Sequence, residues 1–132
     1  MDKKYLLVIS NHSPDKWSES QKEGWDKIGY IPFPEIPADA SWNDVAKIAN
    51  SLKEKIWDFS RRCAREDAEA YLNLQGEYTL CFMLYAMFQG VSYLKFAFPT
   101  TERKVIENVG QDGVVTKTAV FEFKRWRYKG DV

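Results

Sequence analysis

The fold is best inferred from residues 5–9, Tyr-Leu-Leu-Val-Ile. Five successive apolar residues are typical of a strand that is covered on both faces, and such strands belong to parallel sheets. The run ends in the polar turn Ser10-Asn11-His12-Ser13-Pro14. Because parallel strands need crossover connections, we expect strands and helices to alternate along the rest of the chain.

The segment after this strand is predicted to contain a helix and a second strand. Asp15–Asp26 is weakly amphipathic, and Ser18 and Gln21 have the spacing of a capping box, which predicts a helix. Ile28–Phe33 is apolar and is followed by further prolines, which predicts a short strand. The order strand, helix, strand is that of one parallel unit.

A long helix is the clearest feature of the middle of the chain. Ser41, with Asp44 three residues later, predicts the helix start, and the helix is expected to end near Arg65. Its apolar residues recur at spacings of three and four, which predicts one buried face made of Val45, Ile48, Leu52, Ile56, Phe59 and Cys63. The charged residues between them are expected to face water.

The next elements repeat the alternation. Ala70–Leu74 is the third predicted strand, and Thr79–Phe88 is apolar on nearly every side, so this helix is expected to be largely buried. Gly90 is placed to end it in a left-handed turn, and Tyr93–Phe98 is the fourth predicted strand. Four strands alternating with three helices predict a Rossmann-like α/β fold, with a mostly parallel sheet flanked by helices.

The end of the chain has an antiparallel pattern. Lys104–Val109 and Val114–Tyr128 are strand-like and flank Gly-Gln-Asp-Gly at 110–113, which is a turn composition. The apolar residues of the second segment change phase near Lys124 and Arg125, which predicts a β-bulge there. The sequence therefore predicts a C-terminal antiparallel β-hairpin.

Length and composition narrow the class of protein. The 132 residues are enough for one domain, expected to span 1–132. Lys plus Arg equals Asp plus Glu, 19 each, which disfavours a general nucleic-acid binder and predicts no duplex DNA partner. No apolar run approaches the roughly 20 residues that span a bilayer, and the N-terminus lacks a signal-peptide pattern. We therefore expect no membrane contact and a cytoplasmic location.

Residues that commonly bind metals are few and scattered. Cys63 and Cys81 fall on apolar faces of predicted helices without zinc or disulfide spacing, so both are expected to be reduced core residues. His12 is the only histidine. We therefore expect neither a metal nor a cofactor.

Polar segments follow three of the four predicted parallel strands. In a parallel sheet such loops emerge at the same edge, where ligands bind in open α/β folds. The amides near Gly76, where a helix begins, would suit an anionic oxygen. A loop at 100–104, with two hydroxyls and two cations, has the composition of a phosphate-binding site. An ordinary solvent-exposed loop between strands, with charges that bind nothing, explains the same composition equally well. The three loops are Ser10-Asn11-His12, Gln75-Gly76-Glu77-Tyr78 and Thr100-Thr101-Glu102-Arg103-Lys104.

Two titratable residues in these loops are candidates for acid–base chemistry. A histidine side chain can exchange its proton near neutral pH, which suits a general acid or base, and His12 could equally cap the following helix. Glu77 is the second candidate, and its structural alternative is a carboxylate that interacts with a helix dipole.

The three loops, their order and the C-terminal hairpin resemble those of small stand-alone CRISPR-associated Csx proteins of the ring nuclease group, which have a CARF, or Rossmann-like, sensor fold. The resemblance follows the element order of the whole chain and is most specific in the second and third loops and in residues 112–128. It implies a homodimer that binds a cyclic oligoadenylate, with cyclic tetra-adenylate as the favoured ring. It also implies metal-independent cleavage by a ribose 2'-hydroxyl, which switches off a type III CRISPR response.

The resemblance further implies roles for the loop residues. Arg103 and Lys104 would hold phosphate, His12 would move the proton, and Glu77 is the remaining catalytic candidate. Small relatives often carry histidine where this chain has Phe123, so a non-cleaving sensor or sponge is the alternative function. Because 15% of the residues are aromatic, a dimeric scaffold that binds protein is a third hypothesis. The residues implied in ligand binding are Ser10, Asn11, Gln75, Gly76, Tyr78, Thr100 and Thr101.

Overall fold

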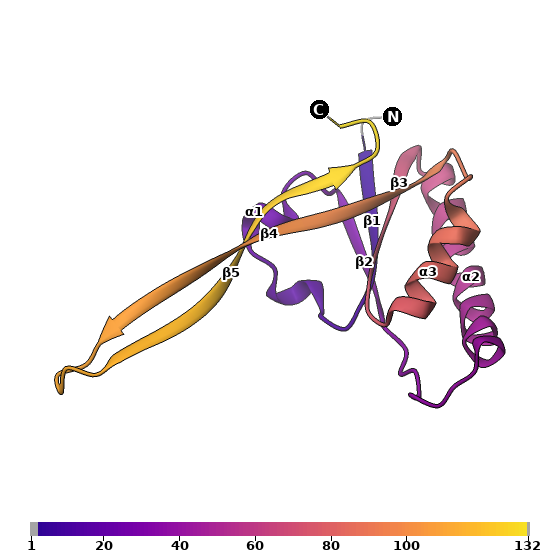
Figure 1. Ribbon diagram of the computed structural model, residues 1–132. Coiled ribbons are helices and arrows are strands. Elements are labelled where there is room, and N and C mark those ends of the chain that lie inside the picture. The colour runs from indigo at the N-terminus through magenta and orange to yellow at the C-terminus, as the bar shows by residue number, and fades with distance from the viewer. Residues whose placement is uncertain (1–2, 132) are drawn as a thin grey trace.

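The protein consists of a five-stranded sheet with helices against it and one long hairpin that leaves the body (Figure 1). The computed structural model describes residues 3–131. The strand order is β2-β1-β3-β4-β5, in which only β5 runs antiparallel to its neighbour. The predicted α/β class and C-terminal antiparallel hairpin are therefore confirmed. The elements are β1 (Lys3–Ser10), the 3-10 helix η1 (Pro14–Lys16), α1 (Glu19–Lys22), β2 (Lys27–Pro32), α2 (Trp42–Arg65), β3 (Ala68–Gln75), α3 (Tyr78–Phe88), β4 (Leu94–Val109) and β5 (Val115–Tyr128).

Strand β1 is covered on both faces, as its apolar run predicts. Leu7 and Ile9 belong to the larger core, which the sheet forms with α2 and α3. Leu6 and Val8 belong to a smaller core on the other face, where the segment with η1 and α1 crosses the sheet. This smaller core, called here the tryptophan core, consists of Leu6, Val8, Tyr71, Ala97 and Trp126, with Trp17, Trp25, Ile28, Phe123 and Tyr128 packed against it.

Helix α2 begins where the sequence predicts. The Ser41 hydroxyl accepts a hydrogen bond from the Asp44 amide at 3.1 Å, and the Asp44 carboxylate accepts one from the Ser41 amide at 3.0 Å. The predicted buried face is largely correct, but Ile48 and Phe59 are only partly buried. The fully buried face comprises Val45, Ala49, Leu52, Ile56, Ser60 and Cys63.

The helix predicted over Asp15–Asp26 is much shorter than expected, although the Ser18 hydroxyl caps it as predicted by accepting a hydrogen bond from the Gln21 amide at 3.3 Å. This segment holds only the short helices η1 and α1, and Gly24 then adopts a positive φ of 89°. Trp17 and Trp25 both pack against Trp126, with ring centroids 5.4 and 5.5 Å apart. Covering the sheet with both tryptophans requires a bent chain, so tertiary packing overrides the weak helical periodicity.

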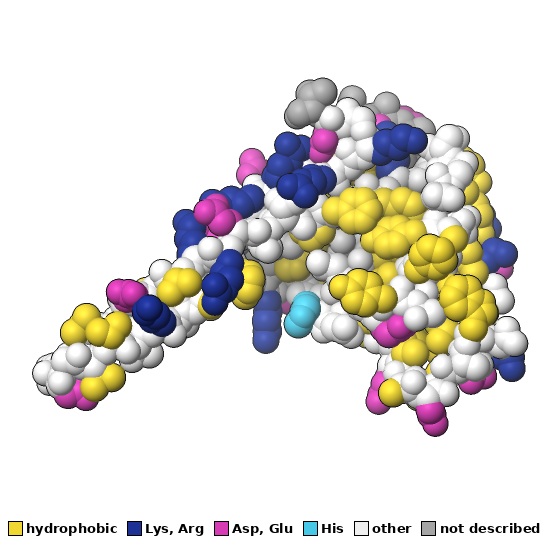
Figure 2. All heavy atoms as spheres, in the orientation of Figure 1, with side chains coloured by type: hydrophobic (Ala, Val, Ile, Leu, Met, Phe, Trp, Pro, Cys, Tyr) yellow, Lys and Arg dark blue, Asp and Glu magenta, His cyan; other side chains and the backbone are white. Residues whose placement is uncertain are grey.

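Helix α3 is less buried than its composition suggests. The sheet and α2 cover two sides, and the third side is open, where Tyr78 is 90% and Phe82 62% exposed. Tyr85 on the same side packs against Phe96 and Phe98 of β4. Figure 2 shows the resulting apolar area at the surface. The left-handed turn predicted at Gly90 is also wrong, because the positive-φ glycines are Gly24, Gly113 and Gly130.

Strand β4 overturns the prediction of a loop at Thr100–Lys104. It pairs with β3 only from Leu94 to Phe96, and then continues to Val109 as a two-stranded ribbon with β5. Residues 100–104 therefore lie within a strand. Pairing with β5 satisfies their backbone groups, which a loop would expose to water. This ribbon, called here the arm, comprises residues 101–124 and projects from the body (Figure 1).

The predicted bulge is confirmed at the root of the arm. Thr100 pairs with Arg125 and Thr101 with Phe123, so Lys124 is the extra residue in β5. The Thr100 hydroxyl donates to the Arg125 carbonyl at 3.1 Å and accepts from the Arg125 amide at 3.2 Å. A bulge bends a strand and increases its twist, and here it lies where the arm leaves the sheet.

The turn and the cysteines agree with the sequence analysis. The tip of the arm is the predicted Gly-Gln-Asp-Gly turn, in which Gly113 has a φ of 81°. Cys63 and Cys81 are buried and unbonded to each other. Within residues 3–131, no helix is long and apolar enough to cross a membrane, and no group of three or more metal-binding side chains is found.

Candidate ligand site at the carboxyl edge of the sheet

Two of the three predicted loops begin side by side. Ser10 at the end of β1 is the register partner of Gln75 at the end of β3. Neighbouring strands lie about 4.8 Å apart, so the segments that follow Ser10 and Gln75 start from adjacent points of one edge. These segments carry Asn11, His12 and Tyr78, which are all exposed. In Figure 2 the single histidine, shown in cyan, lies at the surface below the root of the arm.

The third predicted segment does not form a loop at this edge. Arg103 and Lys104 are consecutive strand residues, so their side chains point to opposite faces of the arm. The Lys104 ammonium lies 2.6 Å from the Glu122 carboxylate across the ribbon. One phosphate therefore cannot be held by both cations of the same chain at this position.

Ser10 has a structural role at the edge. Its side chain is fully buried, and its hydroxyl accepts a hydrogen bond from the His12 amide at 3.1 Å. Its carbonyl accepts from the Tyr30 hydroxyl at 3.1 Å and from the Phe33 amide at 3.0 Å. These bonds fix the turn that follows β1. Ser10 therefore positions His12, and because its own side chain is buried it does not contact a ligand.

Gly76 allows close packing of a phenyl ring. A Cβ at this position would lie 2.6 Å from Cγ of Phe33, and closer still to Cδ2 and Cε2 of the same ring. The space over the glycine is thus filled by the chain's own side chain. The sequence analysis expects a ligand to approach the backbone closely at Gly76, and in the structure the Phe33 ring lies at this position instead.

The Glu77 side chain binds the backbone amides at the start of α3, which the sequence analysis predicts to bind an anionic ligand. Its carboxylate accepts hydrogen bonds from the Thr79 amide at 2.8 Å and the Leu80 amide at 3.0 Å, which caps α3. The Leu80 and Thr79 amides hold the pKa of the Glu77 carboxyl below its usual range. The structural alternative for Glu77 is therefore the one that its contacts support.

The edge retains a compact set of polar groups and one ring. Gln75, Asn11 and His12 are exposed there, and Tyr78 presents its ring to solvent. Thr100 is engaged in the bulge, while Thr101 and Arg103 lie at the root of the arm. An imidazole, two amide side chains and a phenol ring can bind a nucleotide by hydrogen bonding and stacking, and the imidazole can transfer a proton.

Comparison with known proteins identifies the family. The model of the "Uncharacterized protein MJ1673 family" matches residues 4–127. The chain belongs to this family. Neither the curated proteins nor the solved structures give a match to it.

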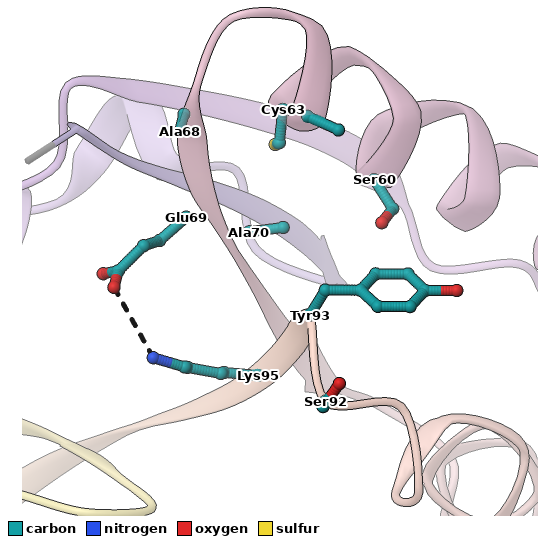
Figure 3. A pocket seen from close by; sticks show the side chains of 9 residues that line it. Ser60, Cys63, Ala68, Glu69, Ala70, Ser92, Tyr93 and Lys95 are labelled. Atoms are coloured by element: carbon teal, nitrogen blue, oxygen red, sulfur yellow. Dashed lines mark ion pairs between the residues drawn. The ribbon is translucent and has the colours of Figure 1, made fainter. Parts of the chain in front are cut away.

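This MJ1673-family protein also has a cavity that the sequence analysis missed. It measures about 250 Å³ and lies at the opposite edge, between the end of α2 and the starts of β3 and β4 (Figure 3). The signal in the sequence is a group of small residues at positions 64, 68 and 70, which leave space beside the Tyr93 ring. The lining residues are Ser60, Cys63, Ala64, Ala68, Glu69, Ala70, Ser92, Tyr93 and Lys95.

The chemistry of this cavity is limited. Burial raises the pKa of the Cys63 thiol to about 11, so the thiol is protonated near neutral pH and is a poor nucleophile. Glu69 and Lys95 form an ion pair, with Oε1 and Nζ 3.6 Å apart. The cavity offers an apolar space with few free polar groups, and we assign the candidate site to the edge that carries His12.

Proposed function

We propose that this protein binds a cyclic oligoadenylate and cleaves it as a metal-independent ring nuclease, which would switch off type III CRISPR signalling. The proposal rests on the resemblance of the sequence to small Csx proteins. The observation that carries it is the exposed His12 next to the end of β3, at the edge where open α/β folds bind ligands. The proposal includes a homodimer, and a cytoplasmic location, because the messenger is made inside the cell.

The reaction is an internal transfer of a phosphodiester. The ribose 2'-oxygen forms a bond to the adjacent phosphorus, the bond from phosphorus to the 5'-oxygen breaks, and a 2',3'-cyclic phosphate and a free 5'-hydroxyl remain. One proton leaves the 2'-hydroxyl and one joins the 5'-oxygen. His12 would take up the proton of the 2'-hydroxyl, and water would supply the proton that joins the 5'-oxygen.

The other exposed groups of the edge fit binding roles. Tyr78 would stack on an adenine, and Asn11 and Gln75 would hydrogen-bond to base or ribose. Much of the rate enhancement would come from holding the 2'-oxygen in line with the phosphorus.

Binding without cleavage is the second candidate function. Two contacts favour it: Lys104 is neutralised by Glu122, and Glu77 fills the amides at the start of α3. Groups that would stabilise the charge of a phosphorane are therefore already engaged. A sensor or sponge would need only stacking and hydrogen bonding at the same edge.

One experiment separates these functions. Purified protein is incubated with cyclic tri-, tetra- and hexa-adenylate, with and without chelator, and products are separated by chromatography with mass detection. We expect linear products ending in a cyclic phosphate, unchanged by chelator. Bound but intact ligand would support the sensor, and absence of binding to all three rings would refute both functions.

A pair of variants tests the role of His12. His12→Ala is expected to slow cleavage by about two to four orders of magnitude, as the loss of a general acid or base does, with ligand affinity nearly unchanged. Lys53→Ala, on the exposed side of α2, is the control and should leave the rate unchanged. An unchanged rate in His12→Ala would remove His12 from the mechanism.

A further inference from the structure

The arm lacks the support that a two-stranded ribbon normally needs. Beyond Phe96, β4 has no ladder partner except β5. Apart from Phe123, every residue from 101 to 124 is exposed. A two-stranded hairpin is marginally stable in water unless it packs on another surface. Since this one projects from the body (Figures 1 and 2), its packing surface has to come from another molecule.

One face of the arm is mostly apolar. Cross-strand partners in an antiparallel ribbon point to the same side, so the pairing defines each face. Phe121 is 68% exposed, Val109 71%, and Val105 and Val115 each 52%. Phe123 packs on Trp126 with ring centroids 5.9 Å apart, which joins this face to the tryptophan core. The apolar arm face consists of Thr101, Arg103, Val105, Glu107, Val109, Val115, Lys117, Ala119, Phe121 and Phe123.

The charges of the arm do not suit a polyanion. Residues 101–124 contain four cationic and four acidic side chains. Three cations are paired within the ribbon: Lys104 with Glu122, Lys117 with Glu107, and Lys124 with Glu102. A neutral ribbon gains little from counterion release on nucleic acid, so a protein surface is the better partner. Within the described residues, the Arg103 guanidinium is the cation of the arm for which no acidic partner is found.

We propose that the arm is a self-association element, and that its apolar face packs on the apolar arm face of a second copy. The inference deepens the homodimer of the proposed function by naming its interface. A two-fold axis across the ribbon at Val105 and Ala119 makes the two arms antiparallel. Each arm then covers the other from root to tip, which is the self-complementary contact that a two-fold dimer requires.

This arrangement is complementary in charge and in size. Residues equally distant from the axis meet, so Arg103 of one copy faces Glu107 of the second copy. Phe121 likewise faces Lys117 of the second copy, which is a cation–π pairing. The large Phe123 near the root meets the small Val115 near the tip. The antiparallel arrangement thus joins opposite charges and places the largest apolar side chains opposite smaller ones.

The area agrees with a specific but modest dimer. Eight residue steps from Thr101 to Val109 span about 27 Å at roughly 3.4 Å per residue, and two strands give a width of about 10 Å. With protruding side chains, the two arms would bury about 1,000 Å² in total, which is the lower range for a biological interface. We therefore expect a dissociation constant in the micromolar range.

Sedimentation velocity over a wide concentration range tests the inference. The wild-type chain is expected to form dimers reversibly. Val105→Asp places two carboxylates next to the two-fold axis and should weaken the dimer by about tenfold or more. Ile106→Asp is the matched control, because it makes the same change one residue along, on the other face of the same exposed strand. It should leave the dissociation constant within about twofold.

A charge exchange tests the predicted register. Arg103→Glu and Glu107→Arg should each weaken the dimer, and the double variant should restore it. A wild-type chain that is monomeric at all concentrations, or equal effects of Val105→Asp and Ile106→Asp, would overturn the inference. Melting curves of all variants exclude unfolding as the cause. Dimers without cleavage would refute only the nuclease, whereas cleavage by a monomer would refute only the arm dimer.

Discussion

Replacing Gly76 with alanine measures how tightly the edge of the sheet is packed. The added Cβ would lie 2.6 Å from Cγ of Phe33, where real Cβ contacts essentially never come closer than 3.0 Å. The ring atom Cγ is bonded to the Phe33 Cβ, so a simple rotation of the ring does not relieve the contact. Either the phenyl ring or the start of α3 has to move.

The expected loss of stability follows from this overlap. Overpacking by one methyl group usually costs about 1–3 kcal/mol in unfolding free energy. For a chain of this size, each kcal/mol corresponds to roughly 3–5 °C in melting temperature. We therefore expect Gly76→Ala to melt about 3–15 °C below the wild-type protein. Glycine-to-alanine changes without a clash usually stabilise by about 0.4–1 kcal/mol, so the sign of the effect is informative.

The melting temperature is measured by circular dichroism for Gly76→Ala, for a control substitution at another glycine, and for a double-mutant cycle with Phe33→Ala. Gly90→Ala is the control, because its Cβ would meet no atom within 4 Å and its φ is not left-handed. In the Phe33→Ala background, Gly76→Ala should lose most of its effect. An equal loss in both backgrounds would show that the backbone, and not the ring, requires glycine. If Gly76→Ala lost ligand binding without losing stability, Gly76 would instead be a residue that contacts the ligand.

Three further substitutions test other contacts. Glu77→Gln should lower stability at neutral pH by about 1 kcal/mol through loss of the cap. The depressed pKa of Glu77 makes its contribution present above the ordinary value of 4.5 and lost as pH falls below it, so the wild-type advantage in melting temperature should vanish in acid. Trp126→Phe removes the 2.9 Å hydrogen bond to the Gln21 carbonyl and should lower the free energy of unfolding, measured by urea titration, by about 1–2 kcal/mol. Asp67→Gly should raise the melting temperature, because Asp67 has a φ of 56°, which glycine adopts without strain; unchanged or lower values would contradict this account.

Local chemistry explains why much of the fold was predictable. The apolar run at 5–9 can only be satisfied by cover on both faces, and the sheet provides it. The Ser41 and Asp44 side chains bond to amides within their own helix turn. The phase change near Lys124 is a property of one strand. Each of these signals depends on residues that are neighbours in the chain, so the sequence alone determined β1, the start of α2 and the bulge.

The tertiary structure decided the candidate site, because its residues contact groups far away in the sequence. Position 76 requires glycine because the ring of Phe33, the residue after β2, packs directly against it. Residues 100–104 are a strand because β5 returns beside them, and no pattern within those five residues encodes that pairing. Trp17 and Trp25 unwind a weak helix because Trp126 offers them a surface. Periodicity and capping depend on neighbours in the chain, whereas packing depends on which distant segment fills the space.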